Sequence, residues 1–204
     1  MISLDIEKAY DMTWRTRILQ ILLRHKITGN MFCFVQNFLN QRTISIRANG
    51  VTSKQVTIDN GVPQGSILSV TLFLLAINDI LNNISLPVKG FLFSDDLIFF
   101  CKGNNTLTTE ALLQDTINKI QSWASKTGFK FSQNKSQCIY FSRRSNNSYN
   151  PNIYLNQKRI KVVNHIKLLG LIFDQKLSWR LQTETLKEDC LRRLNIGTHN
   201  NSTS

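Results

Sequence analysis

Apolar side chains recur at spacings of three and four residues in several stretches of the chain. This spacing predicts amphipathic helices at 14–23, 30–39, 108–126 and 180–194. A longer and almost wholly apolar stretch predicts a further helix over 66–83, with Ser66 as its N-cap. Helices are therefore expected on both sides of the middle of the chain.

Strand patterns fill the segments between these helices. Residues 44–48 alternate between apolar and polar, Asn49-Gly50 follows as a hairpin turn, and 56–58 supplies the return strand. Further strand-like stretches lie at 129–142, with a turn near 133–135, and at 153–155, 159–163 and 167–173. The mixture predicts one α+β domain over 1–195, with helices backing an antiparallel sheet, and a disordered polar tail over 196–204.

The stretch from Phe91 to Phe100 places Asp95 and Asp96 between two apolar runs. We expect a hairpin whose strands are both covered by the core on both faces. A solvated turn would explain the two acids, because Asp is common in turns. A turn held by two buried strands is also a rigid platform, and such platforms suit metal ligands.

Asp5 has a similar setting at the end of the strand-like Ile2-Ser3-Leu4. A helix cap is the ordinary explanation for an acid at this place. Three carboxylates from two rigid elements would instead supply the hard oxygen ligands that Mg²⁺ requires. Two such ions can activate a 3′-hydroxyl and stabilise a leaving pyrophosphate.

The composition narrows the class of protein. The chain has 204 residues, 42% of them hydrophobic, and 25 Lys and Arg against 13 Asp and Glu give a net charge of +12. This charge favours a polyanionic partner such as nucleic acid, although a merely basic globular protein is equally compatible with it. Four cysteines without a CxxC motif indicate free thiols. No signal peptide or membrane-spanning run is evident, so we expect an intracellular protein of the nucleus or cytoplasm that is not secreted and does not contact a membrane.

Five stretches resemble, in order and spacing, the motifs of the reverse transcriptase domain of non-LTR (LINE-type) retrotransposons, most of all the Jockey-like elements. They are DIEKAYD at 5–11, GVPQGSILS at 61–69, FSDD at 93–96, FKFSQNKS at 129–136 and LLGLIFD at 168–174. The likeness extends to about Leu194. It implies a polymerase palm-like antiparallel sheet with partial fingers and connection elements. Relative to that family we expect the chain to be truncated at both ends.

The resemblance implies a catalytic centre. Asp5, Asp95 and Asp96 would be the catalytic acids, with Asp5 and Asp95 as the main metal ligands. They would hold two Mg²⁺ ions, or Mn²⁺, together with the backbone carbonyl of Ile6. Asp11 is instead expected to cap the helix that starts near Thr13.

The resemblance also implies substrate contacts, each with a plainer alternative. Tyr10 would lie under the sugar and exclude a 2′-hydroxyl, or it is a core aromatic. Gln64 would touch the incoming nucleotide or the template and Gly65 would let the backbone approach, or both belong to an ordinary turn. Lys135 would protonate the departing pyrophosphate, or it is a surface lysine.

The implied activity is that of an RNA-directed DNA polymerase that transfers dNTPs onto a primer 3′-hydroxyl. An RNA template, a DNA primer and dNTPs would be its partners, with Gly170 and its neighbours against the primer. The alternative is a catalytically inactive truncated remnant that only binds nucleic acid. Candidate phosphate contacts are Arg42, Arg47, Arg143 and Arg144.

Overall fold

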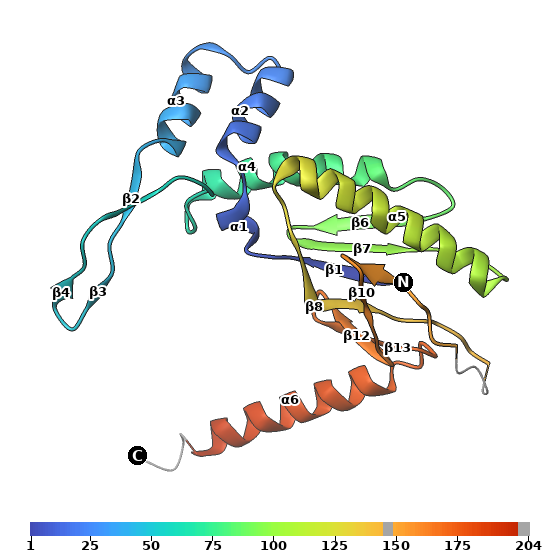
Figure 1. Ribbon diagram of the computed structural model, residues 1–204. Helices are drawn as coiled ribbons and strands as arrows, with labels where there is room; N and C mark the ends of the chain where they lie inside the picture. Colours follow the sequence, from blue (N-terminus) through green and yellow to red (C-terminus); the bar gives the residue numbers. More distant parts are fainter. Residues whose placement is uncertain (145–148, 200–204) are drawn as a thin grey trace.

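The computed structural model describes residues 1–144 and 149–199, and its centre is a five-stranded sheet in the order β11-β8-β1-β7-β6 (Figure 1). The strands are β1 (Ile2–Ile6), β6 (Lys89–Phe93), β7 (Asp96–Phe100), β8 (Phe131–Cys138) and β11 (Lys161–Val162). Neighbouring strands are antiparallel except β8 and β11, which are parallel. The α+β class and the largely antiparallel sheet are therefore confirmed.

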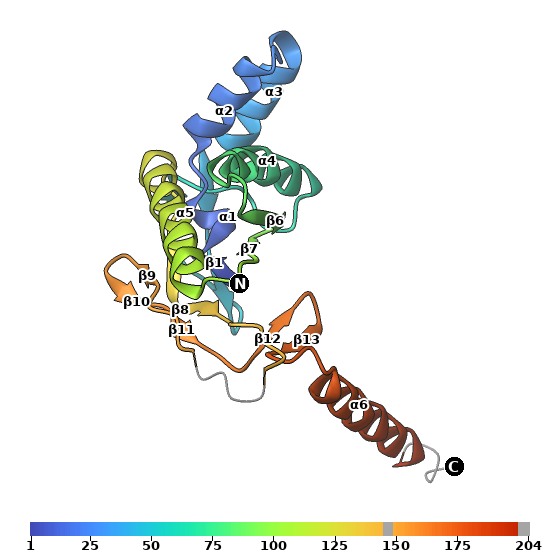
Figure 2. The same cartoon turned by 90° about the vertical axis from the view of Figure 1, so that its right-hand side faces the viewer.

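One face of the sheet is covered by helices. These are α4 (Ile67–Ile77), its 3₁₀ continuation η1 (Asn78–Asn83) and α5 (Thr106–Thr127) (Figures 1 and 2). The buried side chains of β1 join the residues of these helices in one core. Ser3 and Asp5 alternate with them and therefore point to the opposite face, which we call the open face.

The helices lie close to their predicted positions. The stretch 66–83 divides into an α-helix and a 3₁₀ helix, and Ser66 is its N-cap residue without a capping side-chain hydrogen bond. Asn105 caps α5 by accepting hydrogen bonds from the N–H groups of Leu107 and Thr108. Gly128 ends α5 in the left-handed conformation, in which glycine often terminates a helix.

The apolar hairpin departs from prediction in one strand. Strand β7 is buried across Leu97, Ile98 and Phe99, but Phe91 and Phe93 of β6 are 60% and 62% exposed. The expectation that both strands are covered on both faces is wrong for β6, because Phe91 and Phe93 of this edge strand lie on the open face, opposite Ile98 and Asp96. A continuous apolar run does not distinguish an edge strand from a central one.

Strand β8 also differs from prediction, because 133–135 is not a turn. Strand β8 continues through these residues, and its register against β1 shifts between Ser3, opposite Gln137, and Asp5, opposite Ser132. The extra residues form a bulge beside Asp5. Bulges of this kind re-aim side chains next to functional sites.

The other elements extend from the central sheet. Helices α1 (Ala9–Met12), α2 (Arg15–Arg24) and α3 (Gly29–Leu39) lead into an arm made of β2 (Arg42–Ile44), β3 (Arg47–Ala48), β4 (Val51–Thr52) and β5 (Val56–Ile58). The predicted Asn49-Gly50 turn joins β3 and β4. After β8 come β9 (Tyr154–Leu155), β10 (Lys158–Arg159), β12 (His165–Leu168), β13 (Leu171–Asp174) and α6 (Arg180–His199).

The C-terminal helix is longer than expected. It continues to His199, past the predicted end at 194, and the rest of the predicted tail, 200–204, lies outside the described residues. All four cysteines are free. Among the described residues, no helix combines the length and the apolar character needed to cross a bilayer.

Candidate active site

Two of the predicted acids lie directly opposite each other on adjacent strands. Asp5 of β1 pairs with Asp96 of β7, so both point to the open face, and Asp95 precedes Asp96 in the turn from β6. In Figure 1 this turn and the end of β1 lie at the same end of the sheet. The resemblance implied Asp5 and Asp95 as the main metal ligands, whereas the residue directly opposite Asp5 is Asp96.

The three acids act on one another electrostatically. The pKa of Asp96 is raised by partial burial and then by the negative charges of Asp95 and Asp5. Asp95 and Asp96 are only partly exposed, so the turn is not simply solvated. Negative charges grouped in this way repel one another, and a positive charge beside them would reduce the repulsion.

One oxygen of Asp5 is particularly suited to a cation. Its Oδ2 atom is buried and accepts no hydrogen bond from the described residues. The Nζ atom of Lys135 lies 3.5 Å from Oδ2, and the β8 bulge brings it there. Asp5 lies within β1 and caps no helix, since the residue that precedes α1 is Lys8. A buried carboxylate oxygen without a donor costs free energy, and a metal ion would remove that cost.

The possible metal ligands share one end of the sheet but do not form a closed cage. Across residues 1–144 and 149–199, no three acidic, histidine or cysteine side chains are grouped closely enough to hold one ion. Ile6, the predicted carbonyl ligand, is the last residue of β1 and its side chain is buried in the core. The candidate ligands at this end are therefore carboxylate and carbonyl oxygens, a donor type that hard cations such as Mg²⁺ prefer.

Tyr10 lies next to this end of the sheet in α1. It is partly buried, and its ring stacks on Phe73 of α4 with the centroids 4.9 Å apart and the planes at 27°. Tyr10 therefore packs against the core while keeping some exposure. Its two predicted roles, core aromatic and sugar contact, are compatible in this position.

The loop that carries Gln64 and Gly65 is tied to the same helix. The N–H of Val62 donates to the carbonyl of Tyr10 and the N–H of Gly61 to that of Thr13, both at 3.0 Å. A Cβ atom on Gly61 would lie 2.9 Å from backbone atoms of Tyr10 and Asp11, so only glycine permits this approach. The first and second motifs therefore form one packed unit.

Two residues of this unit were missed or misassigned from the sequence. Asp11 does not cap the next helix, whose N-cap position is Trp14; its Oδ1 atom instead accepts a hydrogen bond from the Nε2 atom of Gln64 at 3.0 Å. Arg15 donates to the carbonyls of Asn60 and Gly61, each at 3.0 Å. A sequence signal existed only for Gly61, as a turn residue, because the partners of Asp11 and Arg15 are remote in the chain.

The two glycines predicted to approach substrate both face open space. Gly65 and Gly170 have a φ of 89°, and a Cβ atom on either would meet no described atom within 4 Å. Gly170 lies in the tight turn between β12 and β13. Between that hairpin and the open face of β6 and β7 is an apolar cavity of about 880 Å³, lined among others by Phe91, Phe100 and Phe173.

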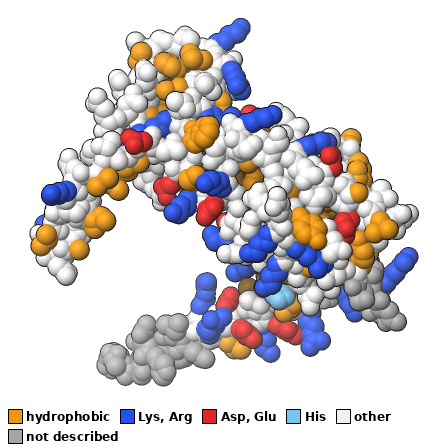
Figure 3. Space-filling model, viewed as in Figure 1, with side chains coloured by type: hydrophobic (Ala, Val, Ile, Leu, Met, Phe, Trp, Pro, Cys, Tyr) orange, Lys and Arg blue, Asp and Glu red, His pale blue; other side chains and the backbone are white. Residues whose placement is uncertain are grey.

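The candidate phosphate contacts lie on two separate elements. Arg42 and Arg47 belong to the arm, where the Arg42 guanidinium lies 5.7 Å from the centre of the Phe38 ring. Arg143 and Arg144 are exposed and follow β8. Figure 3 shows a hollow between the arm and α6, with both basic and acidic side chains on its wall.

Comparison with known protein families agrees with this arrangement. Residues 1–173 match the family model described as reverse transcriptase (RNA-dependent DNA polymerase). The chain belongs to this reverse transcriptase family. The matched residues include all of the predicted site, from Asp5 to Gly170, and end before α6.

Several curated reverse transcriptases of mobile elements are similar to the chain. It is 27% identical to the RNA-directed DNA polymerase from mobile element jockey of Drosophila melanogaster over 86% of its own length. It is 25% identical to a probable RNA-directed DNA polymerase from transposon X-element of the same species over 86% of the chain. A Pol polyprotein from the type-1 retrotransposable element R1 of Bradysia coprophila is 24% identical over 95% of the chain. The chain spans about a fifth of the length of these relatives, with 20%, 19% and 20% covered.

Proposed function

We propose that this chain carries the polymerase centre of an RNA-directed DNA polymerase of a non-LTR retrotransposon. It would add dNTPs to the 3′-hydroxyl of a DNA primer along an RNA template. The observation that carries this proposal is the pairing of Asp5 with Asp96 on the open face, beside Asp95, where the buried Asp5 Oδ2 atom accepts no hydrogen bond from the described part of the chain. Family membership and the mobile-element relatives support the same activity.

The three carboxylates, with the carbonyl of Ile6, would hold the metal ions. Two Mg²⁺ ions, or Mn²⁺ in their place, would increase the acidity of the primer 3′-hydroxyl and neutralise charge on the leaving pyrophosphate. The protein holds the acids in position through the β1–β7 pairing, which fixes Asp5 and Asp96 before any ligand binds. Such preorganisation lowers the cost of assembling the site.

The neighbouring side chains would handle the nucleotide. Tyr10, supported by Phe73, would contact the sugar and exclude a 2′-hydroxyl. Gln64, held by Asp11, would contact the incoming nucleotide or the template, and the open space at Gly65 leaves room for it. Lys135, which is 72% exposed beside Asp5, would give a proton to the leaving pyrophosphate.

The rest of the fold would bind the nucleic acid. In this proposal residues 1–195 form one reverse transcriptase domain. The central sheet is the palm, α2, α3 and the arm belong to the fingers, and β9 to β13 are connection elements. The turn at Gly170 would contact the primer, and Arg42, Arg47, Arg143 and Arg144 would bind phosphates. An intracellular site of action, in the nucleus or cytoplasm, follows from these substrates.

Primer extension tests the proposal directly. The purified chain is given poly(rA)/oligo(dT), dTTP and Mg²⁺, and compared with Asp95→Asn and with Asp115→Asn. Asp115 is an exposed acid on α5 that pairs with Lys119 at 2.7 Å and is not one of the proposed site residues. We expect extension by the wild type and Asp115→Asn and none by Asp95→Asn. If the wild type does not extend the primer but retains salt-sensitive RNA binding, the chain is an inactive nucleic-acid-binding remnant instead.

A further inference from the structure

Four aromatic side chains, from α1, α4, α5 and the segment that follows α5, form a continuous column that ends at Tyr10. Trp123 of α5 stacks on Phe129 with centroids 5.4 Å apart and planes at 4°. Phe129 meets the edge of Phe73 at 6.3 Å and 75°, and Phe73 stacks on Tyr10 at 4.9 Å. Trp123, Phe129 and Phe73 are 8%, 2% and 0% exposed, whereas Tyr10 is only partly buried. Tyr10 is therefore the most exposed member of the column.

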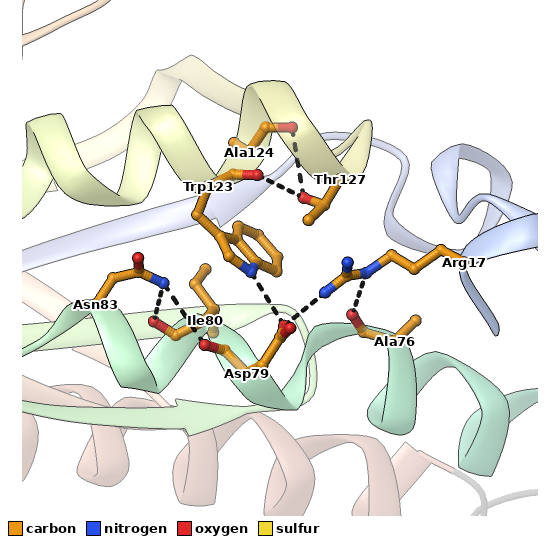
Figure 4. A network of polar contacts seen from close by, with 8 residues as sticks. All are labelled: Arg17, Ala76, Asp79, Ile80, Asn83, Trp123, Ala124 and Thr127. Carbon is orange, nitrogen blue, oxygen red and sulfur yellow. Dashed lines mark hydrogen bonds and ion pairs between the residues drawn. The ribbon is translucent and has the colours of Figure 1, made fainter. Parts of the chain in front are cut away.

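The far end of the column is anchored by charged groups (Figure 4). The Nε1–H group of Trp123 donates to Asp79 Oδ1 at 3.0 Å, and the same oxygen accepts from Arg17 Nη2 at 2.6 Å. Arg17 also donates from Nε to the carbonyl of Ala76 at 2.9 Å, and its guanidinium lies 5.4 Å from the centre of the Trp123 ring. These contacts join α2, α4, η1 and α5 at one point, so Trp123 cannot slide along the column without breaking them.

A column fixed at one end and buried along its length limits how its free end moves. Tyr10 is on a helix of a single turn, α1, which by itself gives little rigidity. The flat face of Phe73 is thus a principal support of the Tyr10 ring. A ring displaced by a fraction of an ångström would change the room left for one additional hydroxyl oxygen on a sugar.

We propose that this column positions Tyr10 and thereby sets how strictly the site rejects ribonucleotides. Phe73 is the direct positioning residue, and Trp123, anchored by Asp79 and Arg17, acts through Phe129 from the far side of the core. This inference rests on the proposed polymerase function, in which Tyr10 contacts the sugar. Sugar selectivity is then determined partly by residues that never touch the nucleotide.

The expected size of the effect follows from the aromatic contacts. Losing one aromatic pair changes an equilibrium between two ring positions by about twofold to tenfold. We therefore expect Phe73→Leu to raise the ratio of ribonucleotide to deoxyribonucleotide incorporation by about this factor. Trp123→Leu should give a smaller rise. Trp123→Phe keeps a ring on Phe129 and should stay near the wild-type ratio.

The first part of the test needs no catalytic activity. The chain is labelled with 3-fluorotyrosine, which gives four fluorine signals for its 4 tyrosines, and the Tyr10 signal is assigned with Tyr10→Phe. Phe73→Leu and Trp123→Leu should shift or broaden the Tyr10 signal, and Trp123→Phe should not. Ile117→Val is the matched control, since Ile117 is fully buried in α5 and is outside the column. An unchanged Tyr10 signal in both leucine variants overturns the proposal.

The second part of the test measures primer extension with dTTP and with UTP for the same variants. A higher UTP-to-dTTP ratio in the leucine variants, with Ile117→Val unchanged, supports the column as a specificity device. A moved Tyr10 signal with an unchanged ratio means that the column only packs the core, which overturns the proposal. If the wild type extends no primer, the proposed function fails, and the fluorine spectra alone decide whether the column holds Tyr10. If Phe73→Leu moves all four signals to their positions in the unfolded protein, that variant does not fold, and the Tyr10 signal of Trp123→Leu decides the test instead.

Discussion

Replacing Asp5 by asparagine should stabilise the metal-free chain, although it removes an ion pair. The pair with Lys135 has a separation of 3.5 Å and an exposed partner, so it contributes about 0.2–1 kcal/mol. Against this, residues directly opposite on antiparallel strands have Cβ atoms about 5 Å apart. Like charges at that distance repel by about 1 kcal/mol with the dielectric of water and by about 3 kcal/mol with an effective dielectric near 20. The buried Oδ2 atom, which accepts no hydrogen bond from the described residues, adds to the cost of the wild-type carboxylate.

The net effect is a gain of about 1 kcal/mol, and for a chain of this size a Tm higher by about 2–4 °C. Thermal unfolding followed by circular dichroism in EDTA measures it, with Asp115→Asn as the control. That control loses an exposed pair on one helix and should fall slightly, by about 0.3–0.5 kcal/mol. If Asp5→Asn lowers the Tm as much as Asp115→Asn does, the Lys135 pair outweighs the repulsion and the reasoning is wrong.

The stabilisation of the chain by Asp5→Asn should also depend on pH. The pKa of Asp96 is raised in the folded chain, so the folded state binds a proton more readily than the unfolded state. Between the unfolded pKa and the raised folded pKa, wild-type stability therefore falls as pH rises. The repulsion is fully present above the folded pKa, and it disappears as the pH falls through it. The advantage of Asp5→Asn should accordingly be largest at neutral pH and shrink in acid, and an advantage independent of pH would exclude repulsion as its cause.

Three further predictions concern the packed loop, the nucleotide contact and the metal. Gly61→Ala should lower the free energy of unfolding in urea by about 2–4 kcal/mol, because it adds a backbone clash to a left-handed φ. Gly50→Ala, at a similar φ in open space, should lower it by about 1 kcal/mol. Equal losses would show that the close approach at Gly61 is unimportant. Asp11→Ala should raise the KM for dTTP about twofold to tenfold in primer extension with a smaller change in kcat, since Gln64 loses its hydrogen-bond acceptor; a change in kcat alone would count against this role. Mg²⁺ at ten times its Kd should stabilise the wild type by about 1.4 kcal/mol in thermal unfolding and leave Asp5→Asn nearly unaffected, and an equal rise in both would place the ion elsewhere.

The residues that the motifs could indicate are those that lie close together along the chain or at recognisable turns. Asp5, Asp95 and Asp96 were grouped because their motifs resemble those of reverse transcriptases, and the β1–β7 pairing shows that Asp5 and Asp96 share a face. The exposure of Phe91 and Phe93 was not predictable, because strand order decides which strand is at the edge.

Contacts between segments that are distant along the chain could not be predicted from the sequence either. Asp11 could be interpreted only as a local cap, since its partner Gln64 comes 53 residues later. The aromatic column was hidden for the same reason, because Tyr10, Phe73 and Trp123 each resemble ordinary core residues of separate helices. The β8 bulge was interpreted as a turn because its polar residues resemble one, and only pairing with β1 shows that the strand continues.

The central claim is the proposal that Asp5, Asp95 and Asp96 are the residues through which this end of the sheet binds metal ions. Counting bound Mn²⁺ by electron paramagnetic resonance tests this claim most directly, in the wild type, Asp5→Asn, Asp96→Asn and the Asp115→Asn control. We predict that the wild type and Asp115→Asn bind Mn²⁺ equally, that Mg²⁺ displaces it, and that either site variant loses binding. Equal Mn²⁺ binding in all four proteins would contradict the claim.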